Sequence, residues 1–246
     1  MNTTESFRFG SLSLRAKGTY LAHALKAVTK QHHGEMRPML RRLIPRDGIV
    51  VDVGGHAGQF ATLFARLASD GRVYSFEPGG YARSLLTLAI RANRIGNVVL
   101  RPEALGDRPR ETMLNVLVKA KGSVRFGLSH LGAEETRPAR RERVTVTTLD
   151  RFAAAEGLER LDFIKADIEG WEMRMLVGGE LTIRRFRPSL MLEMLDSHLN
   201  RAGDSLDGAW ALLSGWGFHP HRWNSGTALE PLATACEGDI VWCPGI

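Results

Sequence analysis

The sequence predicts an α/β protein in which helices cover both faces of one mostly parallel, doubly wound sheet. From Gly48 onward, short apolar runs rich in β-forming residues alternate with stretches of helical periodicity, which is typical of such a sheet. Apolar runs of this kind are expected for parallel strands that are buried on both faces. The 246 residues, 43% of them hydrophobic, suffice for one large core.

Seven strands are expected in this sheet, and five of them alternate with helices. The five strands are predicted at residues 48–54, 72–78, 97–104, 161–167 and 188–194. Helices are predicted at about 58–69, 81–95, 149–157, 170–185 and 205–215. The last two strands, "GFHPHRW" and "GDIVWCP", are expected to form an antiparallel C-terminal hairpin at the sheet edge, where Pro220 is tolerated.

Residues 111–148 interrupt the alternation after the third strand. They contain "ETMLNVLV" and "RVTVTTL", which predict an antiparallel pair around a polar loop with Gly122, Gly127 and Gly132. We interpret this segment as a β-hairpin insertion, and we expect its loop at 119–142 to contribute to a substrate pocket together with the N-terminal helices.

The first 47 residues are predicted to be a basic helical extension of a ligand-binding domain at 48–246. Residues 1–48 hold nine Lys or Arg against three Asp or Glu, and this surplus of six equals the net charge of the whole chain, +6. Apolar residues recur there at helical spacing, which indicates amphipathic helices with the basic side chains on their solvated faces. The apolar set is Leu21, Leu25, Val28, Met36, Leu40 and Leu43; the basic set is Lys26, Lys30, Arg37 and Arg41.

Composition narrows the setting in which the protein works. No RNA-binding motif accompanies the basic charge, so a nucleic-acid partner is not expected. Cys236 and Cys243 have neither metal-ligand spacing nor a disulfide framework around them, which favours a reduced compartment. Without a long apolar run or the apolar core of a secretory signal, we expect a cytoplasmic protein with no membrane span. The sequence does not indicate an oligomeric state.

The first strand ends in a glycine loop, "VVDVGGHAGQF", that predicts a nucleotide-type ligand. Small residues at a strand-to-helix turn let a backbone approach a ligand closely. Asp52, Gly54 and Gly58 give D-x-G-x-x-x-G rather than the G-x-G-x-x-G of dinucleotide binding, and Gly55 and His56 lie between them. This spacing is typical of Rossmann-like, S-adenosylmethionine-dependent methyltransferases.

The ends of the next two strands supply further candidates for binding this cofactor. Glu77, followed by Pro78, ends the second strand 25 positions after Asp52, where an acid can accept hydrogen bonds from both ribose hydroxyls of an adenosine. After the third strand, "PEALGD" places Glu103 and Ala104 close to an expected adenine.

The fourth strand ends in two acids, Asp167 and Glu169, for which four roles are open. Either could be a general base, or both could contact the acceptor or the methionine amino group of the donor. A divalent cation shared with Glu193 is a less favoured alternative, so no metal site is predicted. In the fourth role, Asp167 caps the helix that begins near Gly170. His198 is a further candidate base.

These motifs resemble the FkbM-type methyltransferases over about residues 35–195. The likeness rests on "VVDVGGHAGQFATLFARL", "VYSFEP", "EALGD" and above all "TLDRFAAAEGLERLDFIKADIEGWEMRMLVGG". It implies a class I methyltransferase fold, S-adenosylmethionine as donor and, usually, O-methylation of a hydroxyl on a sugar or natural product. The chain departs from the common pattern at Gly55–Ala57, Ala166 and Trp171, and we expect Trp171 to form a pocket wall.

The sequence therefore predicts an O-methyltransferase that acts on a hydroxyl of a small molecule or glycan. Nucleic-acid or N-methylation on the same fold is one alternative, which would call for a polar-aromatic motif after the fourth strand where this chain has "ADIEGW". A non-catalytic adenosine-binding module is another.

Overall fold

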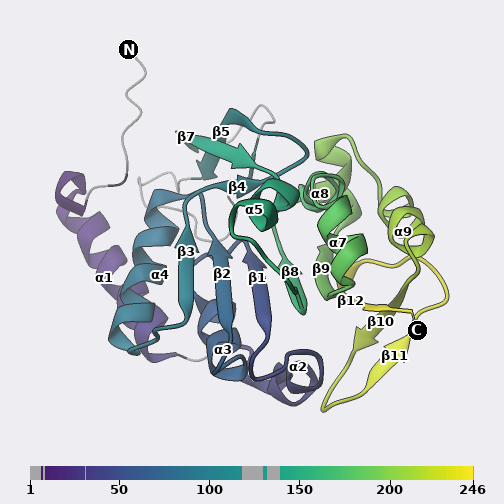
Figure 1. Cartoon of the computed structure of the whole chain (residues 1–246). Helices are drawn as coiled ribbons and strands as arrows, with labels where there is room; N and C mark the ends of the chain where they lie inside the picture. The colour runs from purple at the N-terminus through teal and green to yellow at the C-terminus, as the bar shows by residue number, and fades with distance from the viewer. Residues whose placement is uncertain (1–6, 8, 31, 118–129, 132–138, 246) are drawn as a thin grey trace.

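The protein is built around an eight-stranded sheet with helices on both faces (Figure 1). The computed structural model describes residues 7, 9–30, 32–117, 130–131 and 139–245. Five neighbouring strands are parallel: β3 (Val98–Arg101), β2 (Arg72–Phe76), β1 (Ile49–Val53), β8 (Phe163–Ala166) and β9 (Ser189–Met194). Three antiparallel strands complete the order: β12 (Gly238–Pro244), β10 (Phe218–Trp223) and β11 (Leu229–Pro231).

This arrangement confirms the predicted α/β fold, with one addition and one refinement. The short strand β11 is added at the edge, beyond the seven strands that the sequence predicts. Strand β12 pairs with β10 as expected, but it also pairs with β9 and so lies inside the sheet. The last strand of the chain therefore reaches the middle of the sheet, close to the carboxyl end of β9.

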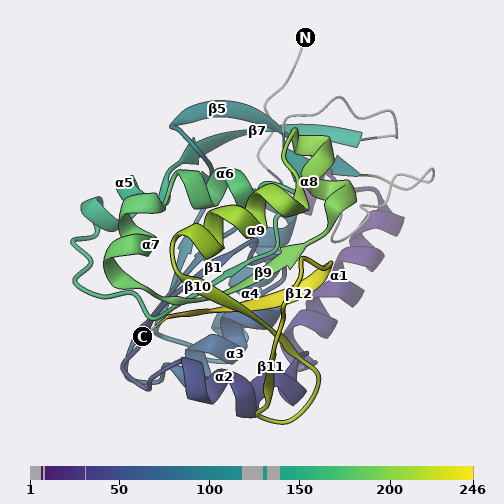
Figure 2. The same ribbon diagram turned by 90° about the vertical axis from the view of Figure 1, so that its right-hand side faces the viewer.

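Helices bury different halves of the core against the two faces of the sheet. On one face lie α2 (Arg37–Leu43) and α3 (Gln59–Leu67), whose Leu40, Leu63 and Phe64 pack on Val50, Phe163 and Met191 of the strands. The other face is covered by four helices that Figure 2 shows together: α5 (Leu149–Ala155), α6 (Glu172–Val177), α7 (Glu180–Phe186) and α9 (Leu206–Gly215). Alternate side chains of each strand point to opposite faces, so both layers share the same strands.

The helices differ from the prediction in two ways: one predicted helix is divided, and one helix is additional. The expected helix at 170–185 is two short helices, α6 and α7, that are separated by Gly178 and Gly179. A Cβ on Gly178 would lie 1.9 Å from the carbonyl oxygen of Gly106. The helix is therefore interrupted where its backbone passes close to the backbone of Gly106. A further helix, α8 (Asp196–Ala202), follows β9 where no helix was predicted; its seven residues are too few for a clear periodic signal.

A second, smaller sheet lies beyond the ends of the main strands, at the top of Figure 1. Its order is β4 (Ala104–Leu105), β7 (Ala139–Thr147), β5 (Arg110–Leu117) and β6 (His130–Leu131). The antiparallel β5–β7 pair confirms the predicted hairpin insertion. The predicted strand at 97–104 is divided, because β3 ends before Pro102 and Ala104 pairs with β7 instead. Residues 119–129 and 132–138 of the expected pocket loop lie outside the described residues.

Helix α1 (Leu14–Thr29) packs on α4 (Gly80–Ala92) with a face other than the predicted one. Tyr20, Ala24 and Ala27 turn inward, whereas Leu21 is 59% exposed and Leu25 is 65% exposed. The prediction for these two leucines was wrong, because small alanines let α1 approach α4 closely and Tyr20 provides the aromatic contact. On α2 the prediction was right for Leu40, which is buried, and for Arg37 and Arg41, which are exposed.

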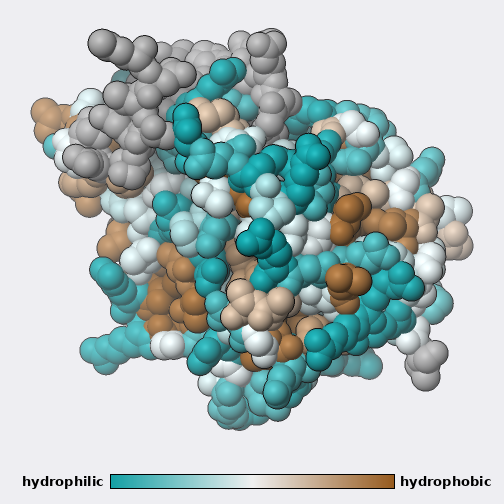
Figure 3. Space-filling model, turned by 45° about the horizontal axis from the view of Figure 1, so that its top comes forward, coloured by the Kyte–Doolittle hydropathy of each residue, from teal (hydrophilic) through white to brown (hydrophobic). Residues whose placement is uncertain are grey.

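Figure 3 views the molecule with the top of Figure 1 turned toward the reader. The surface in this view is a mixture of hydrophilic side chains and separate hydrophobic patches. Within the residues that the structure describes, no helix is both long and apolar enough to cross a membrane.

Candidate active site

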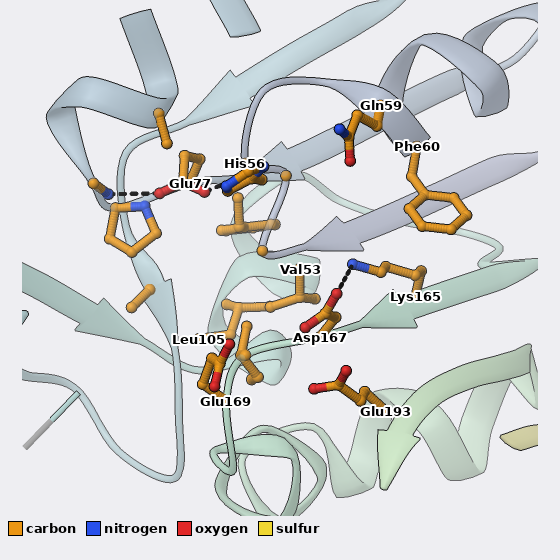
Figure 4. Close-up of a pocket in the computed structure, with 18 of the residues that line it drawn as sticks. Val53, His56, Gln59, Phe60, Glu77, Leu105, Lys165, Asp167, Glu169 and Glu193 are labelled. Carbon is orange, nitrogen blue, oxygen red and sulfur yellow. Dashed lines mark hydrogen bonds and ion pairs between the residues drawn. The ribbon is translucent and has the colours of Figure 1, made fainter. Parts of the chain in front are cut away.

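A cavity of about 430 Å³ opens at the carboxyl ends of β1, β2 and β8, where ligands bind in open α/β sheets. The loop after β1, the start of α3 and the segment after β2 form one side. The segment after β8 and the strands β9 and β12 form the opposite side, and the second sheet closes one end. Figure 4 shows side chains from these elements around the cavity. The cavity therefore collects residues from segments far apart in the chain.

The loop after β1 is held tightly against its neighbours. Gly54 has φ +81°, and a Cβ at this position would lie 2.2 Å from the carbonyl oxygen of Asp167. The amides of Gly54 and Gly55 both donate to the carbonyl oxygen of Phe76, at 3.0 Å each. Glycine at position 54 is thus required both by the backbone conformation and by the close passage of the loop over the end of β8.

Glu77 lines the cavity as a buried carboxylate that two backbone amides orient. Its Oε2 accepts a hydrogen bond from the His56 amide at 2.7 Å, and its Oε1 accepts one from the Gly79 amide at 2.8 Å. Burial raises the pKa of Glu77 to about 7, against the opposing effect of these two amides. An ionised carboxylate accepts about four hydrogen bonds, so capacity remains for two hydroxyls of a ligand.

The residues predicted to bind the cofactor divide into those that line the cavity and those that support it. Gly54, Gly55, His56, Glu77, Pro78 and Ala104 line it. Asp52 lies fully buried beneath the loop, where its Oδ2 accepts a hydrogen bond from Ser75 Oγ at 2.8 Å. Gly58 packs against Leu86 of α4, and Glu103 forms an ion pair with Arg101 at 3.3 Å. The structure does not bring Asp52, Gly58 or Glu103 into the cavity lining.

Apolar residues that the sequence did not single out form the end of the cavity next to the second sheet. Leu105 of β4 and Leu114 and Val116 of β5 line it beside Ala104. A flat, apolar ring such as adenine suits this end. Leu105 directly follows the predicted Ala104, whereas only the pairing of β5 with β7 could have indicated the other two.

The opposite end of the cavity is acidic. Asp167, Glu169 and Glu193 point toward one part of it (Figure 4), and Asp239 of β12 joins them as the register partner of Glu193. Lys165 lies on the same side of β8 as Asp167, with 3.3 Å between its Nζ and Asp167 Oδ2. The sequence did not predict a role for Lys165 or Asp239, since each lies within an apolar strand.

Lys165 and the neighbouring acids give Asp167 and Glu193 opposite protonation states near neutral pH. The charge of Lys165 holds the pKa of Asp167 below its ordinary value, against the effect of burial. Burial, and then the negative charge of Asp167, raises the pKa of Glu193 to about 8. One carboxylate is therefore ionised beside a protonated carboxyl group, the pattern that separates an acid from a base in one site.

His198 lies behind the acids and does not line the cavity. Its Nδ1 is 3.3 Å from Glu169 Oε2 and 3.7 Å from Glu193 Oε2. Burial lowers the pKa of His198. Glu169 itself has φ +57°, and its carbonyl oxygen accepts a hydrogen bond from Arg201 Nη2 at 2.7 Å. The chain thus holds Glu169 in an unusual backbone conformation that turns its carboxylate toward the cavity.

Neither acid caps the following helix, contrary to one of the alternatives. Helix α6 begins at Glu172, and its N-cap residue Trp171 makes no side-chain cap hydrogen bond. Glu172, which the sequence did not single out, is buried, and its Oε1 accepts a hydrogen bond from the Ile168 amide at 2.7 Å. Burial raises the pKa of Glu172 to about 7. This residue secures the turn that presents Asp167 and Glu169.

Trp171 is not a wall of the cavity, and that prediction was wrong. Its side chain is buried in the cluster formed with Leu114, Val144 and Val146 of the second sheet. The guanidinium groups of Arg110 and Arg174 lie 5.1 Å and 5.5 Å from the centre of its ring. The indole is therefore buried against apolar residues of the second sheet, and two guanidinium groups lie close to its ring.

The described part of the chain contains no group of three or more His, Cys, Asp or Glu side chains arranged to hold a metal ion.

The fold and the cavity together define a class I, S-adenosylmethionine-dependent methyltransferase. The buried Glu77 carboxylate, the apolar end beside the second sheet and the loop after β1 all border one cavity at the carboxyl ends of the parallel strands. Residues 52–220, more than half of the chain, match the family model described as the methyltransferase FkbM domain. The chain belongs to this family, which confirms the resemblance and S-adenosylmethionine as cofactor.

Three relatives illustrate the range of similarity. The chain is 27% identical over 211 residues to the AMB antimetabolite synthetase AmbE of Pseudomonas aeruginosa, which covers 72% of this chain and 10% of that protein. The structure resembles a methyltransferase FkbM from Methylobacillus flagellatus KT with a TM-score of 0.53 and 14% identity, over 93% of this chain and 59% of that one. It also resembles cofactor-bound Rv0187 from MTB with a TM-score of 0.51 and 11% identity, over 94% and 90% of the two chains.

The chain thus spans about a tenth of the length of the curated relative and 59% of the FkbM structure. At these identities the two solved structures show a shared fold.

Proposed function

We propose that the protein transfers the methyl group of S-adenosylmethionine to a hydroxyl oxygen of a small molecule or glycan. The observation that carries this proposal is the Asp167 carboxylate, which Lys165 keeps ionised at 3.3 Å on the edge of the cavity. An alcohol is a weak nucleophile until a base removes its proton, so an ionised carboxylate at this place supplies the group that an oxygen acceptor needs.

The chain's residues would hold the donor along the length of the cavity. Glu77 would accept hydrogen bonds from the ribose hydroxyls, and Leu105, Leu114 and Val116, which line the same cavity, would contact the adenine. The loop at Gly54–His56 borders the methionine part, whose ammonium group suits the acidic end. In this orientation the sulfonium would lie on the side of the cavity that Asp167 lines. Holding two reactants in line is a large part of catalysis when the donor is already activated.

The reaction needs one proton transfer from the acceptor. The donor supplies a methyl group on a sulfonium, and the S–CH₃ bond breaks with its electron pair on sulfur as the acceptor oxygen forms the new O–CH₃ bond. Asp167 takes the hydroxyl proton, and the protonated Glu193 beside it donates a hydrogen bond that orients the acceptor or Asp167. Glu169, whose Oε2 lies 3.3 Å from His198 Nδ1, borders the acidic side of the acceptor space.

The proposed acceptor class has support from one relative. The printed name of AmbE, an antimetabolite synthetase, favours a natural-product acceptor over a nucleic acid. The acidic end of the cavity favours the same choice, because carboxylates repel a phosphate backbone.

Methyl transfer from labelled S-adenosylmethionine into a cell extract tests the proposal. The wild-type protein should label a product that mass spectrometry identifies as a methyl ether. The Asp167→Asn variant should bind S-adenosylhomocysteine normally and label about 10²–10⁴-fold more slowly. Labelling at an amine, or wild-type turnover in the variant, would contradict the proposed reaction.

A further inference from the structure

A row of buried polar side chains crosses three strands beneath the cavity. Ser75 of β2, Asp52 of β1 and Lys165 of β8 are successive partners in the strand register. Ser75 Oγ donates to Asp52 Oδ2 at 2.8 Å, and the Nζ of Lys165 reaches Asp167 Oδ2 at 3.3 Å. The row therefore leads from the strands that carry the glycine loop and Glu77 to the acid at the end of β8.

Lys165 occupies an unusual place for an ammonium group. The residue is only 4% exposed, and the Phe60 ring covers the ammonium at 5.0 Å from its centroid. Buried lysines are costly unless they are paired, and two carboxylates neighbour this one. One role that would explain a buried lysine at this position is to neutralise the charge of Asp52. However, the ion pair at 3.3 Å is with Asp167, and the lysine itself lines the cavity.

We infer that Lys165 is a positioning residue of the proposed reaction: its ammonium, 3.3 Å from Asp167 Oδ2, fixes the orientation of that carboxylate, and Asp52 is its register partner on the neighbouring strand. The inference rests on the proposed function, because it assigns the task of Lys165 through Asp167. It extends the site from Lys165 and Asp167, which line the cavity, to Asp52 on the strand that carries the donor loop.

Charged and titratable groups from every neighbouring element act on this pair or on its acidic neighbours Glu193 and Asp239. They are Asp52 of β1, His56 of the loop after β1, Glu169 and Glu172 after β8, Glu193 of β9, His198 of α8, Asp239 of β12 and His33 before α2. Burial alone would lower the pKa of Lys165, but the combined negative charge of Asp167, Asp52 and Asp239 outweighs it and raises that pKa. Lys165 thus stays charged across the range in which enzymes work.

Replacing the lysine should release Asp167. In Lys165→Met, the half-exposed Asp167 carboxylate is left near Glu193, Glu169 and Asp239 without its cation, so the pKa of Asp167 should rise. The acid limb of the pH–rate profile should move to higher pH, and methyl transfer at neutral pH should fall by about a hundredfold. Affinity for S-adenosylhomocysteine should stay close to that of the wild type, because Glu77 and the glycine loop are unchanged.

The test compares Lys165→Met with the double variant Asp52→Asn/Lys165→Met and with Lys26→Met, an exposed lysine of α1. The pKa of Asp167 is followed by carbon NMR of ¹³C-labelled aspartate, with Asp167→Asn for assignment. Calorimetry with S-adenosylhomocysteine and label transfer into extract complete the set. The expected result is a raised Asp167 pKa and slow transfer in both Lys165 variants, with wild-type values in Lys26→Met.

Two outcomes overturn the inference. One is an Asp167 that titrates in Lys165→Met as in the wild type. The other is recovery of transfer in the double variant, because then the lysine serves only to neutralise Asp52. Lys165→Met could fail to fold because it leaves Asp52 as a buried unpaired charge. The double variant removes that charge, and its Asp167 pKa and transfer rate then test the inference. If the wild type does not bind S-adenosylhomocysteine, the proposed function fails, whereas the NMR titration still shows whether Lys165 controls Asp167.

Discussion

The amide of His56 donates to Glu77 Oε2 at 2.7 Å, so the loop after β1 and the acid that follows β2 are joined to each other. Together with the Gly79 amide on Oε1, this bond fixes the carboxylate between two segments that border the cavity. A ligand that binds Glu77 therefore meets a group whose orientation is already set, which lowers the entropy that binding would otherwise cost.

Glu77→Ala should weaken S-adenosylhomocysteine binding by about 1.5–3 kcal/mol, roughly ten- to a hundredfold, because hydrogen bonds to a charged group are lost. The affinity of Glu77→Gln should lie between those of the wild type and Glu77→Ala, since the amide retains one carbonyl acceptor. Calorimetry measures both. Glu103→Ala is the matched control, because Glu103 pairs with Arg101 outside the cavity. Equal affinity in Glu77→Ala would remove the ribose assignment.

Gly54→Ala should cost roughly 2–5 kcal/mol of stability and abolish donor binding, since a Cβ would meet the Asp167 carbonyl and the backbone φ of +81° is strained for alanine. Gly203→Ala separates the two causes. Gly203 has φ +86°, but a Cβ there would meet nothing within 4 Å, so only the strain of about 1 kcal/mol remains. Urea unfolding compares the variants, and equal losses would show that the contact is unimportant.

Glu193 predicts a pH dependence of stability. Its pKa is about 8 in the folded protein against an ordinary value of 4.5, so folding favours its protonated form. The stabilisation relative to an ionised Glu193 is fully present below pH 4.5 and is lost as the pH rises through about 8. Glu193→Gln should therefore be more stable than the wild type at pH 9 and similar at pH 4. Glu159→Gln, at an exposed position, should show no such difference in thermal unfolding.

Trp171→Ala should destabilise the protein by about 3–5 kcal/mol, the usual loss for a buried aromatic residue. Leu21→Ala on the exposed side of α1 should change stability by about 0.5 kcal/mol or less. Folded Trp171→Ala should bind S-adenosylhomocysteine like the wild type, because the indole lies at the junction of the sheets. A large loss of affinity without a loss of stability would return Trp171 to the cavity.

The parts of the site that follow directly from strand ends could be predicted from the sequence. Gly54, Glu77 and Asp167 each come after an apolar run, and parallel strands bring their carboxyl ends to one edge of the sheet. The same reasoning expected Asp52 and Glu103 beside the cofactor, whereas neither lines the cavity, because spacing along a strand does not tell which face a side chain takes.

The remaining residues depend on contacts between distant segments. Asp239 enters the cavity through the pairing of β12 with β9, and Leu114 through the second sheet. Lys165 has the sequence pattern of a strand interior, and only the three-dimensional register reveals its acidic neighbours. On α1, the periodicity is compatible with two buried faces. The contact with α4 buries the face that carries Tyr20 and leaves Leu21 exposed.

The inside position of β12 also has a consequence for synthesis. Strands β10 and β11 reach the sheet only through β12, which is made after both of them. While residues 238–244 are still within the ribosome, the nascent chain can pair β3 to β9 but leaves β9 as an open edge and Asp239 missing from the cavity. Until β12 pairs with it, β9 is an unpaired strand edge, the kind of edge with which other chains can associate.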